Sequence, residues 1–321
     1  MISGVRAIVL DFAEAGPYAV EEEPLRRRGL PLEVVPYEQL VAAPSPAEIV
    51  VNAGDWPLPP AVLDHLPACR CIVSYGIGVD YIDLDDATRR GIVVANTPHA
   101  NVREVAEHTL ALILACWRRL LEYDRGIRAG GFRPDPPFEH HRLAGRTLGF
   151  LAFGRTAQGV SRFGAALGLR QIAHDPYADR ETLAAHGVEP VDLDALLERS
   201  DIVSVHLPAT PATRGFLDAG KLARMRRGAV LVITSRGAIY DADALCAALR
   251  HGPIAAAGVD VFPTEPLPAG HPLTRLPNVI LTPHMAGASE EADAAARANV
   301  AAVIEAMLDG RGPATAVNVR R

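Results

Sequence analysis

Short apolar runs alternate with longer amphipathic stretches along almost the whole chain, and this pattern predicts β-strands separated by helices. In the first part of the chain, runs rich in Val, Ile and Leu cover residues 7–12, 32–37, 49–53, 71–75 and 92–96. A second set covers residues 147–153, 171–174, 202–207, 230–234, 256–261 and 279–282. Such alternation is typical of parallel sheets built from βαβ units, so we expect an α/β protein with two parallel sheets.

Three further stretches complete the predicted outline. Apolar positions at helical spacing predict helices over about 102–121 and 290–308. The polar, proline-rich stretch 125–142 lacks periodicity, and we interpret it as an extended arm. A length of 321 residues with 49% apolar content exceeds what one core usually organises, so we expect two domains.

Composition removes several classes of function. The chain has 32 basic and 38 acidic residues, a formal charge of −6 and no cluster of Lys or Arg, so nucleic acid is not an expected partner. No apolar run approaches the ~20 residues that span a bilayer, and we expect no membrane partner and a cytoplasmic location. The four cysteines lack CxxC spacing, and His99 and the pair His140–His141 have no third ligand at suitable spacing, so we expect no metal.

The segment that joins strand 147–153 to the next helix carries a degenerate dinucleotide-binding motif. Ala152-Phe-Gly154-Arg-Thr-Ala157 follows the Gly-x-Gly-x-x-Gly pattern with Ala at its first and third positions. Gly154 would let the backbone approach a pyrophosphate, and the helix N-terminus would offer N–H groups to that anion. Asp175 ends the next strand about 20 residues later, where a carboxylate binds ribose hydroxyls and repels a 2′-phosphate. We therefore expect NAD as cofactor, with Ala152 as a departure whose methyl group would weaken NAD binding.

Three polar residues follow three successive strands of the second set. Arg236, Glu265 and His284 come after strands 230–234, 256–261 and 279–282, and the carboxyl ends of parallel strands share one edge of a sheet. A guanidinium suits a carboxylate with an adjacent carbonyl, and His can deliver a proton near neutral pH. A carboxylate beside the imidazole would raise its pKa. The three groups therefore fit hydride transfer at C2 of a small 2-hydroxy or 2-oxo acid.

Six segments between about residues 70 and 290 carry a family resemblance. They are Ser74–Asp80, Val105–Leu112, His206–Pro208, Thr234–Gly237, Gly258–Pro266 and Thr282–His284. At these segments the sequence resembles the D-isomer-specific 2-hydroxyacid dehydrogenases, which include phosphoglycerate dehydrogenase and the C-terminal-binding-protein corepressors. The first 70 residues match in pattern alone, and Ala152 and Ile233 depart from the family's motifs.

The resemblance implies a fold and a set of site residues. It implies a flavodoxin-like substrate domain of residues 1–98 and 290–321 and an inserted Rossmann NAD-binding domain of residues 99–289, in a homodimer. Arg236 would bind the substrate and His284, paired with Glu265, would be the acid/base. Tyr75, Gly76 and Ile77 would also bind the substrate, through backbone amides near Gly76 and Ile77. The expected cofactor contacts are Gly154, Arg155, Thr156, Asp175, His206, Pro208, Thr213, Thr234, Ser235, Asp260, His284 and Gly287.

Two questions stay open at this level. The corepressor relatives keep the same triad, so the alternative is an NAD(H)-sensing interaction protein with little turnover, which Ala152 favours slightly. The chain has no low-complexity segment to recruit partners, which favours the enzyme. The substrate could be pyruvate, hydroxypyruvate, glyoxylate, or a phospho- or phosphono-substituted acid if Arg103 pairs with a second anionic group.

Overall fold

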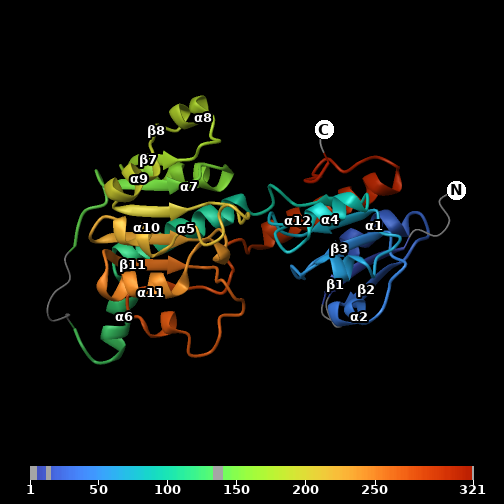
Figure 1. The fold of residues 1–321 in the computed structure, drawn as a ribbon, viewed down its shortest axis with the longest axis horizontal. Coiled ribbons are helices and arrows are strands. Elements are labelled where there is room, and N and C mark those ends of the chain that lie inside the picture. Colours follow the sequence, from blue (N-terminus) through green and yellow to red (C-terminus); the bar gives the residue numbers. More distant parts are fainter. Residues whose placement is uncertain (1–5, 12–15, 133–139, 320–321) are drawn as a thin grey trace. The chain divides into compact units, whose positions relative to one another are not determined.

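The chain forms two compact units, one of which is built from both ends of the sequence. The computed structural model describes residues 6–11, 16–132 and 140–319. The first unit comprises Met1–Asn101 with Ser289–Arg321, and the second comprises Val102–Ala288. In Figure 1 the blue N-terminal and red C-terminal segments accordingly lie in the same unit. The chain therefore leaves the first unit once and returns to it.

The first unit contains a five-stranded parallel sheet with the order β2-β1-β3-β4-β5. Its strands are β1 (Ala7–Asp11), β2 (Leu32–Pro36), β3 (Ile49–Asn52), β4 (Cys71–Ser74) and β5 (Val93–Ala95). This strand order is that of flavodoxin-like sheets.

Helices cover both faces of the first sheet. They are α1 (Ala19–Arg26), α2 (Tyr37–Ala42), α3 (Pro60–Leu63), α4 (Leu84–Arg89) and α12 (Glu290–Leu308). Ile8 and Leu10 pack with residues of α2, α3 and α4, whereas Val9 packs with residues of α1 and α12. Because both faces are covered, the inner strands β1, β3 and β4 are buried along almost their whole length instead of alternating, whereas the edge strand β2 has no buried residue.

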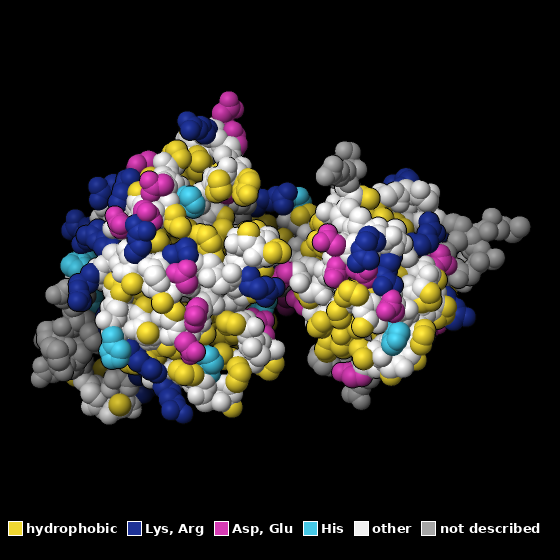
Figure 2. Space-filling model, viewed as in Figure 1, with side chains coloured by type: hydrophobic (Ala, Val, Ile, Leu, Met, Phe, Trp, Pro, Cys, Tyr) yellow, Lys and Arg dark blue, Asp and Glu magenta, His cyan; other side chains and the backbone are white. Residues whose placement is uncertain are grey.

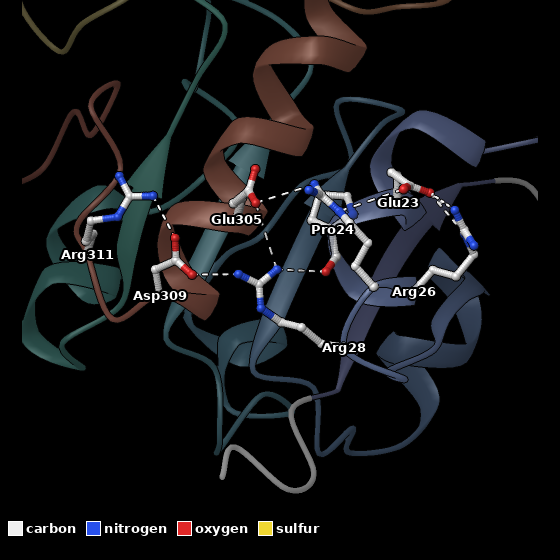
Figure 3. A network of polar contacts seen from close by, with 8 residues as sticks. Glu23, Pro24, Arg26, Arg28, Glu305, Asp309 and Arg311 are labelled. Carbon is white, nitrogen blue, oxygen red and sulfur yellow. Dashed lines mark hydrogen bonds and ion pairs between the residues drawn. The ribbon is translucent and has the colours of Figure 1, made fainter.

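Helix α12 packs against α1, although the two helices lie at opposite ends of the chain. Leu25 of α1 and Val300 and Ile304 of α12 are fully buried in one cluster. Around them, Arg28 donates to Asp309 at 2.6 Å and to the Pro24 carbonyl at 2.9 Å, in the polar network of Figure 3. Exposed ion pairs contribute about 0–1 kcal/mol each and a buried aliphatic side chain about 1.5–3 kcal/mol, so the apolar contact dominates this docking.

The C-terminal tail extends the first sheet past β5. Ala316 forms an antiparallel bridge with Ala95, and the Val317 amide donates to the Val94 carbonyl at 2.8 Å. The Val94 amide in turn donates to Asn318 Oδ1 at 2.8 Å. The tail thus satisfies backbone groups that an edge strand would otherwise leave unpaired.

The second unit contains a seven-stranded parallel sheet with the order β12-β11-β10-β9-β6-β7-β8. Its strands are β6 (Thr147–Leu151), β7 (Arg170–His174), β8 (Val188–Pro190), β9 (Ile202–Val205), β10 (Ala229–Ile233), β11 (Ile254–Val259) and β12 (Val279–Leu281). With β6 as its first strand, this is the Rossmann order with one added strand. The strand order reverses between β6 and β9, where such sheets bind their ligands.

Helices also cover both faces of the second sheet. They are α5 (Val102–Trp117), α7 (Arg155–Ala166), α8 (Arg180–Ala185), α9 (Leu193–Arg199), α10 (Ala219–Arg224) and α11 (Ala242–His251), with short 3-10 turns η1 (Gly237–Ile239) and η2 (Pro272–Arg275). Helix α6 (Leu120–Arg128) follows α5 and buries none of its residues. Residues of α5, α7 and α8 form one buried cluster, and residues of α9, α10 and α11 form another. The sheet separates these two clusters.

The predicted α/β class with two parallel sheets is confirmed, with differences in detail. The helix expected over 102–121 ends at Trp117, because Arg119 adopts a left-handed backbone with φ of 53°. Helix α6 then runs to Arg128, so the start of the expected extended arm is helical. Residues 133–139 of that arm lie outside the described residues. Strand β8 was not predicted.

Candidate active site

The three predicted catalytic residues lie in loops at the carboxyl end of the second sheet. Arg236 follows β10, Glu265 follows β11 and His284 follows β12. His284 adopts a left-handed backbone with φ of 54°, which is unusual for a residue with a Cβ. Its amide donates to the Asp260 carbonyl at 2.7 Å. Such a conformation persists where the surrounding contacts determine it.

The His284 imidazole and the Glu265 carboxylate form a hydrogen-bonded pair. His284 Nδ1 lies 2.7 Å from Glu265 Oε2, and Glu265 Oε1 accepts the Phe262 amide at 2.7 Å. The bond from Glu265 raises the pKa of His284 above its ordinary value despite partial burial. Burial acts to raise the pKa of Glu265, but the bonds from His284 and Phe262 outweigh it and leave that pKa lowered. The pair therefore favours an imidazolium beside a carboxylate.

Arg236 is held close to this pair by a tight backbone contact. A Cβ added to Gly237 would lie 1.9 Å from the backbone C and O atoms of Phe262, so the turn after β10 packs directly on the loop that carries Glu265. Tyr240 reinforces the contact by donating to the Val261 carbonyl at 3.1 Å. The positive charge of Arg236 acts to lower the pKa of both members of the pair. The structure thus brings Arg236, Glu265 and His284 together.

The turn between β6 and α7 has the form expected of a phosphate-binding turn. Gly154 is the N-cap of α7 and has no side chain that could cap the first amides of the helix, and a helix N-terminus is a place where proteins bind anions. A Cβ added to Gly154 would meet nothing within 4 Å. Ala152 is 8% exposed and has a left-handed φ of 69°. The first position of the motif therefore uses the backbone conformation that glycine adopts most readily. Arg155 and Thr156 open the helix.

Asp175 lies beside this turn, directly after β7. Its Oδ2 accepts the Phe153 amide at 2.9 Å, and its Oδ1 accepts the Tyr177 amide at 2.9 Å. The carboxylate therefore ties the end of β7 to the turn after β6. Each oxygen retains a second lone pair that a ribose hydroxyl could use.

The other expected cofactor residues follow neighbouring strands of the same sheet. His206 and Pro208 come after β9, and Thr213 donates to the Pro208 carbonyl at 2.5 Å. Thr234 and Ser235 come after β10, and Gly287 follows the His284 loop. Burial lowers the pKa of His206 to about 4, so its ring is neutral at physiological pH, and its Nε2 lies 2.8 Å from Ser204 Oγ. The carboxyl edge of the sheet thus carries the expected cofactor residues.

Asp260 is fully buried, with its carboxylate directed to the loop that carries His284. Oδ1 accepts the Thr282 hydroxyl at 2.6 Å and the Met285 amide at 3.0 Å, and Oδ2 accepts the Ala286 amide at 3.0 Å. Three donors therefore compensate the buried charge.

The expected substrate-binding residues Tyr75, Gly76 and Ile77 belong to the first unit, in the turn after β4. The Tyr75 hydroxyl donates to the buried carboxylate of Glu21, and the Gly76 amide donates to Ser74 Oγ at 3.0 Å. The Ile77 carbonyl accepts a bond from Asn96 at 2.7 Å. The amide of Gly76 is therefore already engaged within the turn.

Two residues of α5 contact the site region, and the sequence interpretation gave them no role. His108 Nε2 lies 3.0 Å from Thr282 Oγ1, and Thr109 Oγ1 lies 2.8 Å from Thr234 Oγ1. Both belong to the motif Val105–Leu112, but helical spacing alone does not indicate which neighbouring strand a helix residue contacts. The one sequence signal that could have pointed to a role for these two residues is their place in that motif.

The surface and the remaining polar groups add three observations. On the face shown in Figure 2, basic and acidic side chains are interspersed on both units. Among the described residues, no helix is long and apolar enough to cross a membrane, and no three His, Cys, Asp or Glu side chains are grouped to hold a metal ion. The four cysteines are buried thiols, and burial raises the pKa of Cys69 to about 12.

Comparison with known proteins gives consistent matches. Residues 110–286 match the family model for the D-isomer specific 2-hydroxyacid dehydrogenase, NAD binding domain. The chain is 39% identical to glyoxylate reductase of Aeropyrum pernix, over 88% of this chain and 86% of that protein. A structure of D-lactate dehydrogenase from Aquifex aeolicus, complexed with NAD and lactic acid, superposes with a TM-score of 0.84 at 28% identity, covering 95% of this chain and 96% of that one.

A third relative is longer than this chain. D-3-phosphoglycerate dehydrogenase of Mycobacterium leprae is 38% identical over 88% of this chain, but the match covers 53% of that protein. The chain thus spans about half the length of this relative.

Proposed function

We propose that this chain, which belongs to the D-isomer-specific 2-hydroxyacid dehydrogenase family, transfers a hydride between NAD(H) and C2 of a small D-2-hydroxy or 2-oxo acid. The observation that carries the proposal is the pair of His284 Nδ1 and Glu265 Oε2 at 2.7 Å, held next to Arg236 at the carboxyl edge of the NAD-binding sheet. This arrangement offers an anion clamp and a proton donor at one place.

Arg236 binds the substrate in this proposal. Its guanidinium pairs with the carboxylate and the adjacent carbonyl oxygen of a 2-oxo acid, which a planar fork of N–H donors suits. In the first unit, the proposed group for a substrate carboxylate is the Ile77 amide, since the Gly76 amide already donates to Ser74. Tyr75 would hold the shape of this turn, because its hydroxyl bonds to Glu21, its amide donates to the Asn52 carbonyl at 3.3 Å and its carbonyl accepts the Thr97 hydroxyl.

His284 is the acid/base. Because Glu265 engages Nδ1, Nε2 is the nitrogen that faces the substrate oxygen and gives or takes the proton. In reduction, C2 gains a hydride while the carbonyl oxygen gains the proton of His284, and the product is the 2-hydroxy acid. Reduction requires the imidazolium, whose share falls as pH rises through the raised pKa of His284. Oxidation requires the neutral ring, so its rate should rise over the same pH interval.

NAD supplies or accepts the hydride when it is bound. The open space at Gly154 and the uncapped start of α7 fit its pyrophosphate, and Arg155 and Thr156 lie at the same helix start. Asp175 fits the adenosine ribose. His206, Pro208, Thr213, Thr234, Ser235, Asp260 and Gly287 lie along the same edge of the sheet and would surround the rest of the cofactor.

A turnover assay tests the proposal. Purified protein is incubated with NADH and one acid at a time, and the loss of NADH absorbance is followed. The acids are glyoxylate, hydroxypyruvate, pyruvate and 3-phosphohydroxypyruvate. We expect at least one acid to be reduced, with activity lost in Arg236→Ala and His284→Ala. A wild-type protein that binds NADH and reduces none of these acids would instead support the alternative, an NAD(H)-sensing interaction protein, which the strained Ala152 favours.

We also propose that the protein acts as a homodimer in the cytoplasm. Helix α6 buries none of its residues, and Leu120 and Ile127 are 52% and 54% exposed. Phe132, just beyond it, is 81% exposed. A second copy packed on α5, α6 and the following residues would remove this apolar surface from water. Light scattering at micromolar concentration should give the mass of a dimer, and a stable monomer would contradict the proposal.

A further inference from the structure

Two consecutive residues of α5 reach the ends of two different strands, each just before a catalytic loop. His108 contacts Thr282, which lies two residues before His284. Thr109 contacts Thr234, which lies two residues before Arg236. One turn of α5 therefore touches both strand ends that carry the acid/base and the substrate clamp.

Close packing fixes α5 against these strands. A Cβ added to Gly258 of β11 would lie 2.8 Å from Leu112 Cβ, and a Cβ added to Gly159 of α7 would lie 2.8 Å from Ala106 Cβ. Both glycines allow α5 to approach more closely than a side chain would permit. The helix thus has little freedom to shift relative to the sheet.

The direction of the hydrogen bonds from α5 to Asp260 follows from their chemistry. An ionised carboxylate only accepts, so the single Thr282 hydroxyl proton goes to Asp260 Oδ1 at 2.6 Å. Thr282 Oγ1 must then accept from His108, whose Nε2 therefore carries a proton. The chain of donors runs from His108 to Thr282 to Asp260.

Asp260 links this chain of hydrogen bonds to the His284 loop through both its backbone carbonyl and its carboxylate. Its carbonyl accepts the His284 amide at 2.7 Å, and its carboxylate accepts the next two amides, those of Met285 and Ala286, at 3.0 Å each. These bonds surround the left-handed backbone of His284, a conformation that a residue other than glycine adopts only where its surroundings hold it. The same loop carries the imidazole that bonds to Glu265.

We propose that His108 and Thr282 are positioning residues that act through Asp260 to hold His284 against Glu265. The inference rests on the proposed function for its kinetic consequence, but its structural part does not need turnover. Neither residue touches the reacting atoms in this scheme. Their role is to keep the imidazole paired with Glu265, with Arg236 and Asp260 as the other charged groups that act on it.

Two substitutions of Thr282 provide the main test. Thr282→Val keeps the shape and removes the hydroxyl, whereas Thr282→Ser keeps the hydroxyl. We expect the Val variant to lower kcat for reduction by about tenfold, the effect of one lost hydrogen bond, with a smaller change in KM for NADH. The alkaline limb of its pH profile should move to lower pH, because a loosened His284 loses part of the bond that raises its pKa. The Ser variant should keep the wild-type profile.

Substitutions in α5 separate positioning from general stability. His108→Leu should behave like Thr282→Val in weaker form, and His108→Gln, which keeps an N–H donor, should restore the profile. Thr109→Val is the matched control, since it removes a hydroxyl from the neighbouring position of the same helix but acts on the strand of Arg236. It should leave the alkaline limb in place and raise KM for the oxo acid.

An NMR titration keeps the inference separate from the proposed function. The His284 ring signal, identified by its loss in His284→Gln, can be titrated in wild type and Thr282→Val without substrate. A lower pKa in the Val variant supports the positioning role even if the wild type reduces no 2-oxo acid, which would defeat the proposed function alone. An unchanged His284 pKa in Thr282→Val, or equal kinetic losses in the Val and Ser variants, would overturn the inference.

Discussion

Replacing Gly154 by Ala adds one methyl group to the turn between β6 and α7, at a point where the folded protein has room for it. The added Cβ meets nothing within 4 Å, and the Gly154 backbone, with φ of −74° and ψ of −171°, is extended and allowed for Ala. The free energy of unfolding should therefore change by less than about 0.5 kcal/mol. The methyl group would, however, occupy the space that a pyrophosphate needs to reach the first amides of α7.

The expected effect on cofactor binding is much larger than the effect on folding. Weakening one or two hydrogen bonds to a charged group, each worth about 1.5–3 kcal/mol, should raise the Kd for NADH by ten- to a hundredfold or more. Fluorescence titration gives the Kd, and thermal unfolding gives the stability. Gly312→Ala is the control, because a Cβ there also meets nothing within 4 Å but lies in the first unit. An unchanged Kd in a stable Gly154→Ala protein would refute the placement of the phosphate at this turn.

Four other predictions follow from the site. Ala152→Gly should relieve a left-handed backbone at φ of 69° and tighten NADH binding, and a weaker Kd would show that the methyl group contributes to the turn. Glu265→Gln removes the bond to a carboxylate that raises the pKa of His284, so the alkaline limb of reduction should move to lower pH in a rate profile; an unmoved limb would exclude the pairing as its cause. His284→Ala should lower kcat in both directions by about 10²–10⁴-fold, whereas Arg236→Ala should also raise KM for the oxo acid in steady-state assays. The carboxylate of Asp175 should give a higher kcat/KM with NADH than with NADPH, and equal values would remove its proposed role.

The strands could be predicted because each is a short apolar run bounded by turn residues. Strand β8 was not predicted because two of its three residues, Glu189 and Pro190, are exposed and form no apolar run, whereas β5 and β12 are equally short but apolar throughout. The break at Arg119 also escaped, since its left-handed backbone follows no glycine or proline signal. Local pattern thus predicts apolar strands, including the edge strands β5 and β12, better than it predicts strands without an apolar run and helix ends.

The candidate site shows the same limit. Arg236, Glu265 and His284 could be expected at one edge because parallel strands end together there. The role of Gly237 could not be predicted. A side chain is excluded there because the backbone of Phe262, a residue of another loop, lies too close. His108 was equally hidden, because its partner Thr282 is 174 positions away in the sequence. Contacts of this kind are decided by tertiary packing.

The composition of the first unit from two distant segments has a consequence for synthesis of the chain. While a ribosome makes the protein, α1 emerges early, but α12, which covers its apolar face, emerges after the entire second unit. The second unit is continuous in sequence and can fold as it emerges, whereas Leu25 and its neighbours must wait for Val300 and Ile304. Nascent chains stalled before residue 290 should therefore expose the α1 face to chaperones and proteases, and release of α12 should end that exposure.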